Sequence, residues 1–326
     1  MRVWAWIVVA ACGQSSNPAS HVDAPATGKM DAPMMSSASD GSVGSAVDAS
    51  VDSVPYGSDG PVPYMVQTAT LTAGTTYNVT AYIPTSSGKH PAVSFSAGSQ
   101  QTAAGYAPYG MRLASYGIAT IIADDPGILV NTGVVVSNAV YTVATWIPST
   151  FPDSIDTTKI GLAGHSRGGA ASLLAAEGDL AGKVVAWFGL DPVDNEFGMA
   201  PTAYARTDLP MLQIPTSFIG AEVASNCAPT ADSYPTLFPL APSPSTLVVG
   251  QNAGHVELEL QSACVACAIC TPAGTADPTV VLAYAVRYTT AFFARELLGD
   301  TSVGATFDGA GGPGDVAAGL VTITSK

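Results

Sequence analysis

Residues 159–169 of the 326-residue chain read KIGLAGHSRGG, and this stretch decides the fold. Its apolar start, residues 159–163, predicts a buried β-strand, and the small residues at 168–177 predict a helix. Ser166 lies between them in a G-x-S-x-G pattern, which is typical of a nucleophile on a sharp strand-to-helix turn. Glycines on both sides of the serine let neighbouring backbone approach closely. The alternative is a glycine-rich turn with an incidental serine.

The sequence on both sides of this turn alternates between predicted strands and predicted helices. Strands are expected at residues 62–70, 76–82, 92–96, 118–123, 159–163, 183–189, 213–220 and 246–249. Helices are expected at residues 103–115, 131–146, 168–177 and 278–298. This order predicts an α/β fold with a mostly parallel central sheet, helices on both faces and an antiparallel opening pair. Ligands in such sheets bind at the carboxyl ends of the strands, where Ser166 lies.

A nucleophilic serine needs a general base, and histidine is the side chain best suited to that role near neutral pH. The chain has four histidines. His21 precedes the folded part and His90 precedes a strand, while His165 lies in the turn itself and is expected to pack or to hydrogen-bond. His255 directly follows the last predicted strand, so it is the expected base.

Three carboxylates are candidates for the acid that orients this histidine. Asp191 ends the predicted strand 183–189 and is followed by Pro192, which favours an extended exit from the strand. Asp194 lies three residues further on, and Glu222 follows the next strand. We favour Asp191, with Glu222 and Asp194 as alternatives.

Two backbone N–H groups are expected to form an oxyanion hole. The first is the N–H of Arg167, at the start of the helix after the serine. The second should come from the loop after strand 92–96, with Ser99 as first choice and Gln100 as second. The Arg167 side chain has two candidate roles, binding a substrate carbonyl or forming a local salt bridge.

The composition limits the partners of the chain. Its net charge is −14, and the 11 lysines and arginines form no cluster. Because a phosphate backbone is bound by clustered basic residues, we expect no nucleic-acid partner. A hydrophobic fraction of 47% is enough to bury one large core.

The N-terminus predicts export. Residues 1–12 place one basic residue before a short apolar run, as in a signal peptide, and VAAC at 9–12 resembles a bacterial lipobox that would make Cys12 a lipidation site. An ordinary cleaved signal is the alternative. Residues 13–60 are poor in large apolar side chains and are expected to form a disordered spacer, with the catalytic domain over 61–326. The membrane is then a partner only through the lipid anchor.

The remaining cysteines lie in the last third of the chain: Cys227, Cys264, Cys267 and Cys270. In an exported protein they are expected to form two disulfides, with a pairing that the sequence leaves open. The C-x-x-C-x-x-C spacing also admits a metal or iron–sulfur site, but the segment lacks a second cluster. We therefore expect no metal and no cofactor.

Several of these segments together resemble a known family. GHSRGG at 164–169 resembles the nucleophile turn of chlorophyllases, and GLDPVD at 189–194 resembles the segment that carries their acid. LASYGI at 113–118 and DPG at 125–127 are similar to chlorophyllase-like and polyester-hydrolase (cutinase-like) enzymes. The resemblance extends from about residue 61 to 298 and implies an α/β-hydrolase with a Ser–Asp–His triad and no cofactor, which supports Asp191.

The chain departs from the pattern in two places. It has Ser99-Gln100-Gln101 where lipases often carry His-Gly-Gly, and a cysteine-rich insertion, residues 264–270, follows His255. The insertion is expected to cover the pocket.

Together these features predict a serine carboxylic-ester hydrolase that acts through an acyl-enzyme on a small-molecule or polymeric ester. The alternatives are a polyester hydrolase or lipase of the same fold, or a catalytically silent surface-binding lipoprotein.

Overall fold

The computed structural model describes residues 56–127, 129–195, 204–264, 267–303 and 314–326. Nine strands in these residues form one sheet in the order β1-β2-β4-β3-β5-β6-β7-β8-β9. The strands are β1 (Tyr64–Thr72), β2 (Thr76–Pro84), β3 (His90–Ser96), β4 (Ala119–Ala123), β5 (Ile155–His165), β6 (Ala186–Leu190), β7 (Thr216–Val223), β8 (Ser245–Gly254) and β9 (Val321–Ser325). The predicted signal peptide, the lipobox cysteine Cys12 and most of the predicted spacer lie outside the described residues.

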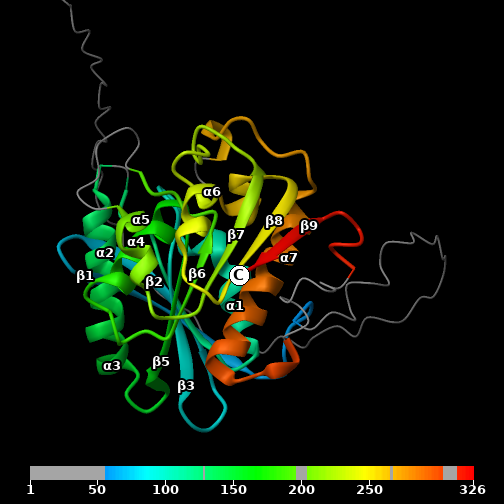
Figure 1. Ribbon diagram of the computed structural model, residues 1–326. Helices are drawn as coiled ribbons and strands as arrows, with labels where there is room; N and C mark the ends of the chain where they lie inside the picture. The colour runs from blue at the N-terminus through cyan, green and yellow to red at the C-terminus, as the bar shows by residue number, and fades with distance from the viewer. Residues whose placement is uncertain (1–55, 128, 196–203, 265–266, 304–313) are drawn as a thin grey trace, which may run out of the picture. The chain divides into compact units, whose positions relative to one another are not determined.

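The direction of the strands confirms the predicted fold class. The six central strands from β4 to β8 pair in parallel, whereas β1 and β2 are antiparallel to each other and β2 is antiparallel to β4. The turn between β1 and β2 contains Gly74 with φ 88°, a conformation that favours glycine. The result is a mostly parallel sheet with antiparallel strands at both edges, since β9 also pairs antiparallel with β8 (Figure 1).

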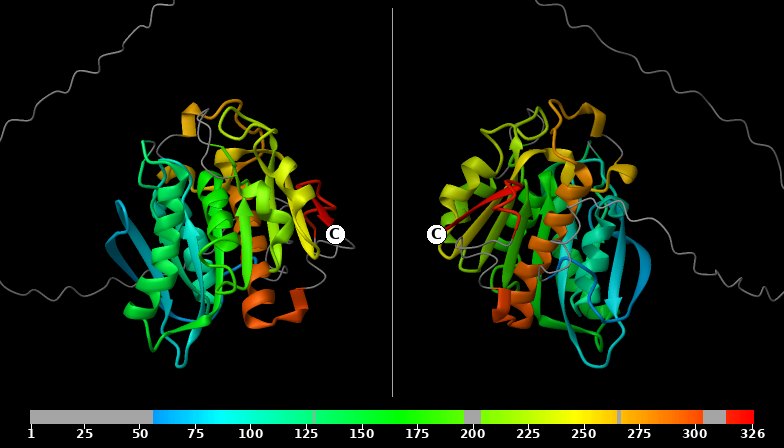
Figure 2. Two further views of the ribbon diagram at one scale, coloured as in Figure 1. Left: turned by 60° about the vertical axis from the view of Figure 1, so that its left-hand side comes forward. Right: turned by 90° about the vertical axis from the view of Figure 1, so that its right-hand side faces the viewer.

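Helices cover both faces of this sheet. The longer ones are α1 (Ala107–Ser115), α2 (Thr132–Tyr141), α4 (Ser166–Glu177) and α7 (Pro278–Phe293), and the shorter ones are α3 (Ile147–Thr150), α5 (Ala205–Asp208) and α6 (Tyr234–Leu237). Helices α1 and α7 pack on one face, and α2 and α4 pack on the other (Figures 1 and 2). Side chains from each pair of helices and the sheet face beneath it form a separate buried cluster.

Strand β6 shows how the two clusters are filled. Successive residues of a strand point to opposite faces, so the neighbours Trp187 and Phe188 enter different clusters. The Trp187 ring meets Phe218 at 5.0 Å between centroids, whereas Phe188 meets Phe292 and Phe293 of α7 at 5.4 and 6.3 Å. The aromatic residues predicted as a core stripe in residues 278–298 are buried as expected.

Three differences from the sequence prediction matter for the site and the edge of the sheet. Residues 56–60, assigned to the spacer, are bound to the folded part: Arg112 donates to the carbonyl of Tyr56 and pairs with Asp59. Strand β8 continues to Gly254 instead of ending at 249, so His255 follows it directly. Strand β9 was not predicted, and it pairs antiparallel with β8. Residues 246–249 are therefore not in the last strand of the sheet.

Candidate active site

Ser166 is the first residue of α4, directly after β5. Its φ of 54° is a left-handed conformation that a non-glycine residue adopts at a cost of about 1–3 kcal/mol. The flanking glycines are required by space. A Cβ on Gly164 would lie 2.4 Å from the carbonyl oxygen of Gly168, and one on Gly168 would lie 2.3 Å from the carbonyl oxygen of Ala97. The backbone is therefore held in the sharp turn expected from the sequence.

His255 and Asp191 form a buried pair beside this turn. The Nδ1–H of His255 donates to Oδ2 of Asp191 at 2.7 Å, and both side chains are at least 97% buried. Asp191 follows β6 with φ 38°, and its backbone N–H donates to Ile219 of β7 at 2.6 Å. Because Nδ1 carries the proton, Nε2 of a neutral His255 is left as an acceptor. A pocket at this edge of the sheet is lined by both Ser166 and His255.

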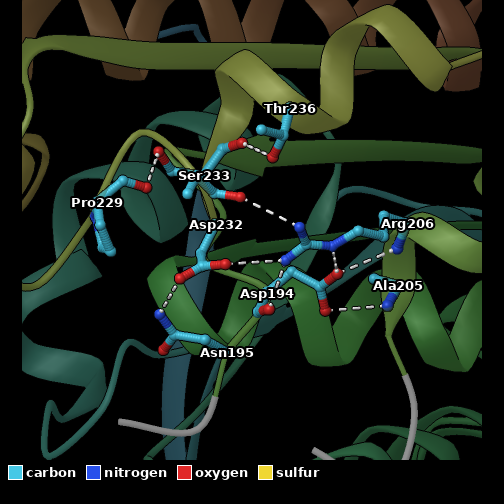
Figure 3. A network of polar contacts seen from close by, with 9 residues as sticks. Asp194, Asn195, Ala205, Arg206, Pro229, Asp232, Ser233 and Thr236 are labelled. Atoms are coloured by element: carbon cyan, nitrogen blue, oxygen red, sulfur yellow. Dashed lines mark hydrogen bonds and ion pairs between the residues drawn. The ribbon is translucent and has the colours of Figure 1, made fainter. Parts of the chain in front are cut away.

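The two alternative acids are bound elsewhere. The carboxylate of Glu222 is exposed and accepts from the backbone N–H of Asn252 at 2.6 Å. Asp194 is buried, but it accepts from the backbone N–H of Ala205 at 2.9 Å and pairs with Arg206 at 2.9 Å, as Figure 3 shows. Of the three candidate carboxylates, only Asp191 bonds to His255.

His165 is bonded through both ring nitrogens. Nε2 lies 3.1 Å from the carbonyl oxygen of His255, and Nδ1 lies 2.7 Å from the hydroxyl of Tyr106. Burial, with a smaller contribution from nearby His255, lowers the pKa of His165 well below its usual value, so the ring is neutral. It supports the backbone of His255 from within the core.

The loop after β3 carries two candidate oxyanion donors, the N–H groups of Ser99 and Gln100. Only the first of them is left without an acceptor in the described residues. The Gln100 N–H donates to Oδ1 of Asp125 at 2.9 Å and is not available to a substrate. The Ser99 N–H has no acceptor within the described residues, and Ser99 lines the pocket. Arg167 is the second residue of α4, so its N–H has no partner one turn earlier in the helix. The N–H groups of Ser99 and Arg167, the two preferred donors, are thus both available to an oxyanion.

Sequence reasoning assigned no role to Asp125, which links the loop after β3 to the start of α4. Its carboxylate accepts from the Gln100 N–H and forms an ion pair with the guanidinium of Arg167. Arg167 also donates to the carbonyl of Val130 at 2.7 Å and of Gly127 at 3.2 Å. Of the two roles considered for the Arg167 side chain, the structure shows the local salt bridge. Two sequence signals could have pointed to it: its position after strand β4 and its place in the DPG segment at 125–127.

We expect Asp125→Asn to lower kcat by about 10–100-fold with a small change in KM, because the loop carrying Ser99 would lose its charged anchor. Asp124→Asn is the matched control. Asp124 binds the N–H of Ala103 at 2.7 Å, outside the pocket lining, and its substitution should change kcat by less than about threefold. Steady-state kinetics on folded variants gives both values. Equal losses in the two variants would contradict the proposed role of Asp125.

The four cysteines of the last third form two disulfides, as predicted. Cys227 pairs with Cys270, and Cys264 pairs with Cys267. The first disulfide and Ile269 line the pocket, so the cysteine-rich insertion does border the site. Glu259, Cys264 and Cys267 lie close enough to share a metal ion, with ligand atoms within 4.8 Å. In the disulfide form, however, neither sulfur is a thiolate ligand.

A strained serine, a histidine bonded to a buried aspartate, and Ser99 therefore meet at one pocket at the carboxyl edge of a parallel sheet, and the Arg167 N–H lies at the start of the helix after the serine. The sequence model of the chlorophyllase family matches residues 57–273, which include all of these groups. No curated protein matches the chain. The match covers about two thirds of the sequence, and together with the fold it shows that the chain belongs to the chlorophyllase family, within the α/β-hydrolase superfamily of serine esterases.

Proposed function

We propose that this chain is a serine carboxylic-ester hydrolase that works through a covalent acyl-enzyme. The observation that carries the proposal is the bond from His255 Nδ1 to Asp191, 2.7 Å long, in a pocket that also contains Ser166. Family membership supports an ester as the bond that is cleaved.

In the proposed reaction, Oγ of Ser166 attacks the ester carbonyl while Nε2 of His255 takes its proton. The carbonyl oxygen becomes an oxyanion, which the N–H groups of Ser99 and Arg167 stabilise. His255 then passes the proton to the leaving alcohol, and the acyl group stays on Ser166. A water molecule, deprotonated by His255, attacks the acyl-enzyme, and Ser166 recovers the proton as the acid leaves.

Asp191 has two roles in this scheme. It holds the ring in the tautomer that leaves Nε2 free to accept, and its negative charge stabilises the imidazolium that forms. The pair is buried, so its electrostatic interaction is screened less than a surface pair would be.

The substrate is proposed to be a small or polymeric ester. The pocket is partly open to solvent, and its walls include Val256 and Ile269. A polyester hydrolase or a lipase is the second candidate, and the exposed side chain of Ile269 at the pocket favours it because it could contact an extended apolar chain.

We also propose that the protein is exported and is held at a membrane through a lipid on Cys12, with the membrane as a partner only through that anchor. Its two disulfides support an oxidising compartment. Among the described residues, none of the helices has the length and apolar character needed to cross a bilayer.

The function is tested with p-nitrophenyl acetate, butyrate and decanoate. We expect an initial burst of p-nitrophenol close to one equivalent per enzyme, followed by slower turnover, and a mass increase of one acyl group on the peptide containing Ser166. The chain-length profile separates a short-chain esterase from a lipase. No turnover, together with no labelling of Ser166 by a fluorophosphonate, would contradict the proposal and favour a binding lipoprotein.

A further inference from the structure

Glu259 is a carboxyl group of the pocket that the proposed mechanism does not use. It follows the short helix η5 (His255–Leu258), lines the pocket with Ser166 and His255, and is 1% exposed. The Leu260 N–H donates to the carbonyl of Gly105 at 2.8 Å and fixes the backbone beside it. The Glu259 side chain is therefore a buried part of the pocket wall on a fixed backbone.

The neighbours of Glu259 do not satisfy both oxygens of its carboxyl group. Sγ of Cys264 lies 3.4 Å from Oε1 and Sγ of Cys267 lies 3.8 Å away, but a disulfide sulfur has no proton to donate. Oε2 has no hydrogen-bond partner in the described part of the chain. A buried polar atom left in this state costs stability, so it calls for a ligand or another explanation.

The nearby hydroxyl of Tyr106 is already in use. The carbonyl of His255 can only accept, so Nε2 of the neutral His165 donates to it and Nδ1 must accept. The acceptor Nδ1 takes the single Tyr106 hydroxyl proton at 2.7 Å, and the Tyr106 oxygen itself accepts from the Gly98 N–H at 3.1 Å.

A second polar atom of the pocket, besides Oε2 of Glu259, is buried without a hydrogen-bond partner in the described residues. Oγ of Ser99 is buried and has no hydrogen-bond partner in the described part of the chain, and Ser99 and Glu259 line the same pocket. Apolar side chains, Val256 and Ile269, also line this pocket. Two unpartnered polar groups in such surroundings mark a place where a polar part of the substrate would be recognised.

We propose that Glu259 and the side chain of Ser99 form a polar subsite that recognises a neutral hydroxyl group on the ester substrate. The inference rests on the proposed esterase function and names the class of ester: one that carries a hydroxyl group near the scissile bond, in its acyl or its alcohol part. A hydroxyl both donates and accepts, so its chemistry matches a carboxyl group and a serine hydroxyl that line the same pocket.

The charge state of Glu259 agrees with a neutral ligand. Burial raises the pKa of the Glu259 carboxyl to about 8. At pH 7 the carboxyl is therefore mostly protonated, and it can donate one hydrogen bond and accept another. An ammonium group on the substrate would find no countercharge there, and the net charge of −14 disfavours an anionic substrate.

The test compares esters in which a methyl group replaces the hydroxyl. For the acyl part the pair is p-nitrophenyl 3-hydroxybutyrate and 3-methylbutyrate, and for the alcohol part it is 2-hydroxyethyl and propyl butyrate. We expect the full-length enzyme to prefer the hydroxyl ester of one pair by about tenfold or more in kcat/KM, since a site built for a hydroxyl rejects the analogue that lacks it. The pair that shows the preference tells which side of the ester the subsite faces.

Variants of Glu259 assign that preference. Glu259→Gln keeps a donor and an acceptor and should retain most of the preference, whereas Glu259→Met should bring the ratio close to one. Glu257→Gln is the control: Glu257 is also buried, but it accepts from the Gly254 N–H at 2.9 Å and does not line the pocket, so the ratio should stay at the wild-type value. If Glu259→Met fails to fold, Ser99→Ala removes the other side chain and should lower the ratio about threefold or more.

The outcomes separate this inference from the proposed function. Turnover of both members of each pair at equal kcat/KM would overturn the polar subsite and leave the esterase intact. A Glu259→Met variant with the wild-type ratio would overturn the role of Glu259. Absence of turnover of any ester by wild-type enzyme would overturn both proposals.

Discussion

Replacing Ser166 with alanine should lower kcat for p-nitrophenyl butyrate by about 10⁴-fold or more, which is the loss seen when a triad nucleophile is removed. The hydroxyl is the atom that forms the acyl bond, and no other group can take its place. Alanine keeps the Cβ and the backbone at φ 54°, so the fold should be unchanged. Steady-state hydrolysis at high enzyme concentration measures the residual rate.

Ser172→Ala is the matched control for this loss. Ser172 is a second buried serine of α4, and its hydroxyl donates to the Gly169 carbonyl at 2.8 Å and accepts from the Trp187 indole at 2.9 Å. Its removal should cost about 1–3 kcal/mol of stability because the indole N–H loses its partner, while kcat stays within about threefold. Wild-type turnover and burst in the Ser166→Ala variant would disprove the nucleophile assignment.

Ser166 and His255 could be predicted from sequence because their signals are local. A strand, a G-x-S-x-G turn and a helix lie within 20 residues, and the backbone strain at Ser166 follows from that short connection. His255 followed by elimination, since the other three histidines lie before the folded part, before a strand or in the turn itself. Such inferences need no knowledge of distant contacts.

The groups that the sequence did not reveal depend on contacts between distant segments. Asp125 bonds to a loop 25 residues away and to an arginine 42 residues away, and no spacing rule links these positions. Strand β9 follows a glycine-rich segment and is short, so its alternating pattern carries little weight until it pairs with β8. Glu259 was missed because the features that distinguish it, its burial in the pocket and an Oε2 atom with no hydrogen-bond partner among the described residues, are visible only in the structure.

The choice among the three acids needed both local sequence signals and contacts between distant segments. Asp191 and Asp194 follow β6, and Glu222 lies near the end of β7 at the same edge of the sheet, so position alone could not separate them. The structure separates them by their partners. Asp194 forms an ion pair with Arg206, and Glu222 accepts a hydrogen bond from the backbone N–H of Asn252. The chemical test of that choice is a substitution of Asp191 that changes which ring nitrogen of His255 carries the proton and leaves the shape of the site nearly unchanged.

Asp191→Asn should lower kcat about 10³–10⁴-fold near neutral pH. If the amide N–H₂ of the new side chain faces the ring, Nδ1 must accept, and the proton moves to Nε2, where it blocks removal of the Ser166 proton. Because asparagine has nearly the shape of aspartate, KM and stability should change little.

Glu222→Gln is the comparison, since Glu222 is exposed and bonds to the Asn252 N–H at 2.6 Å, and it should keep kcat within about threefold. Part of the activity of Asp191→Asn should return as pH rises, when hydroxide can replace the missing base. A loss in Glu222→Gln as large as that in Asp191→Asn would mean that Glu222 orients the base, against the 2.7 Å bond between His255 and Asp191.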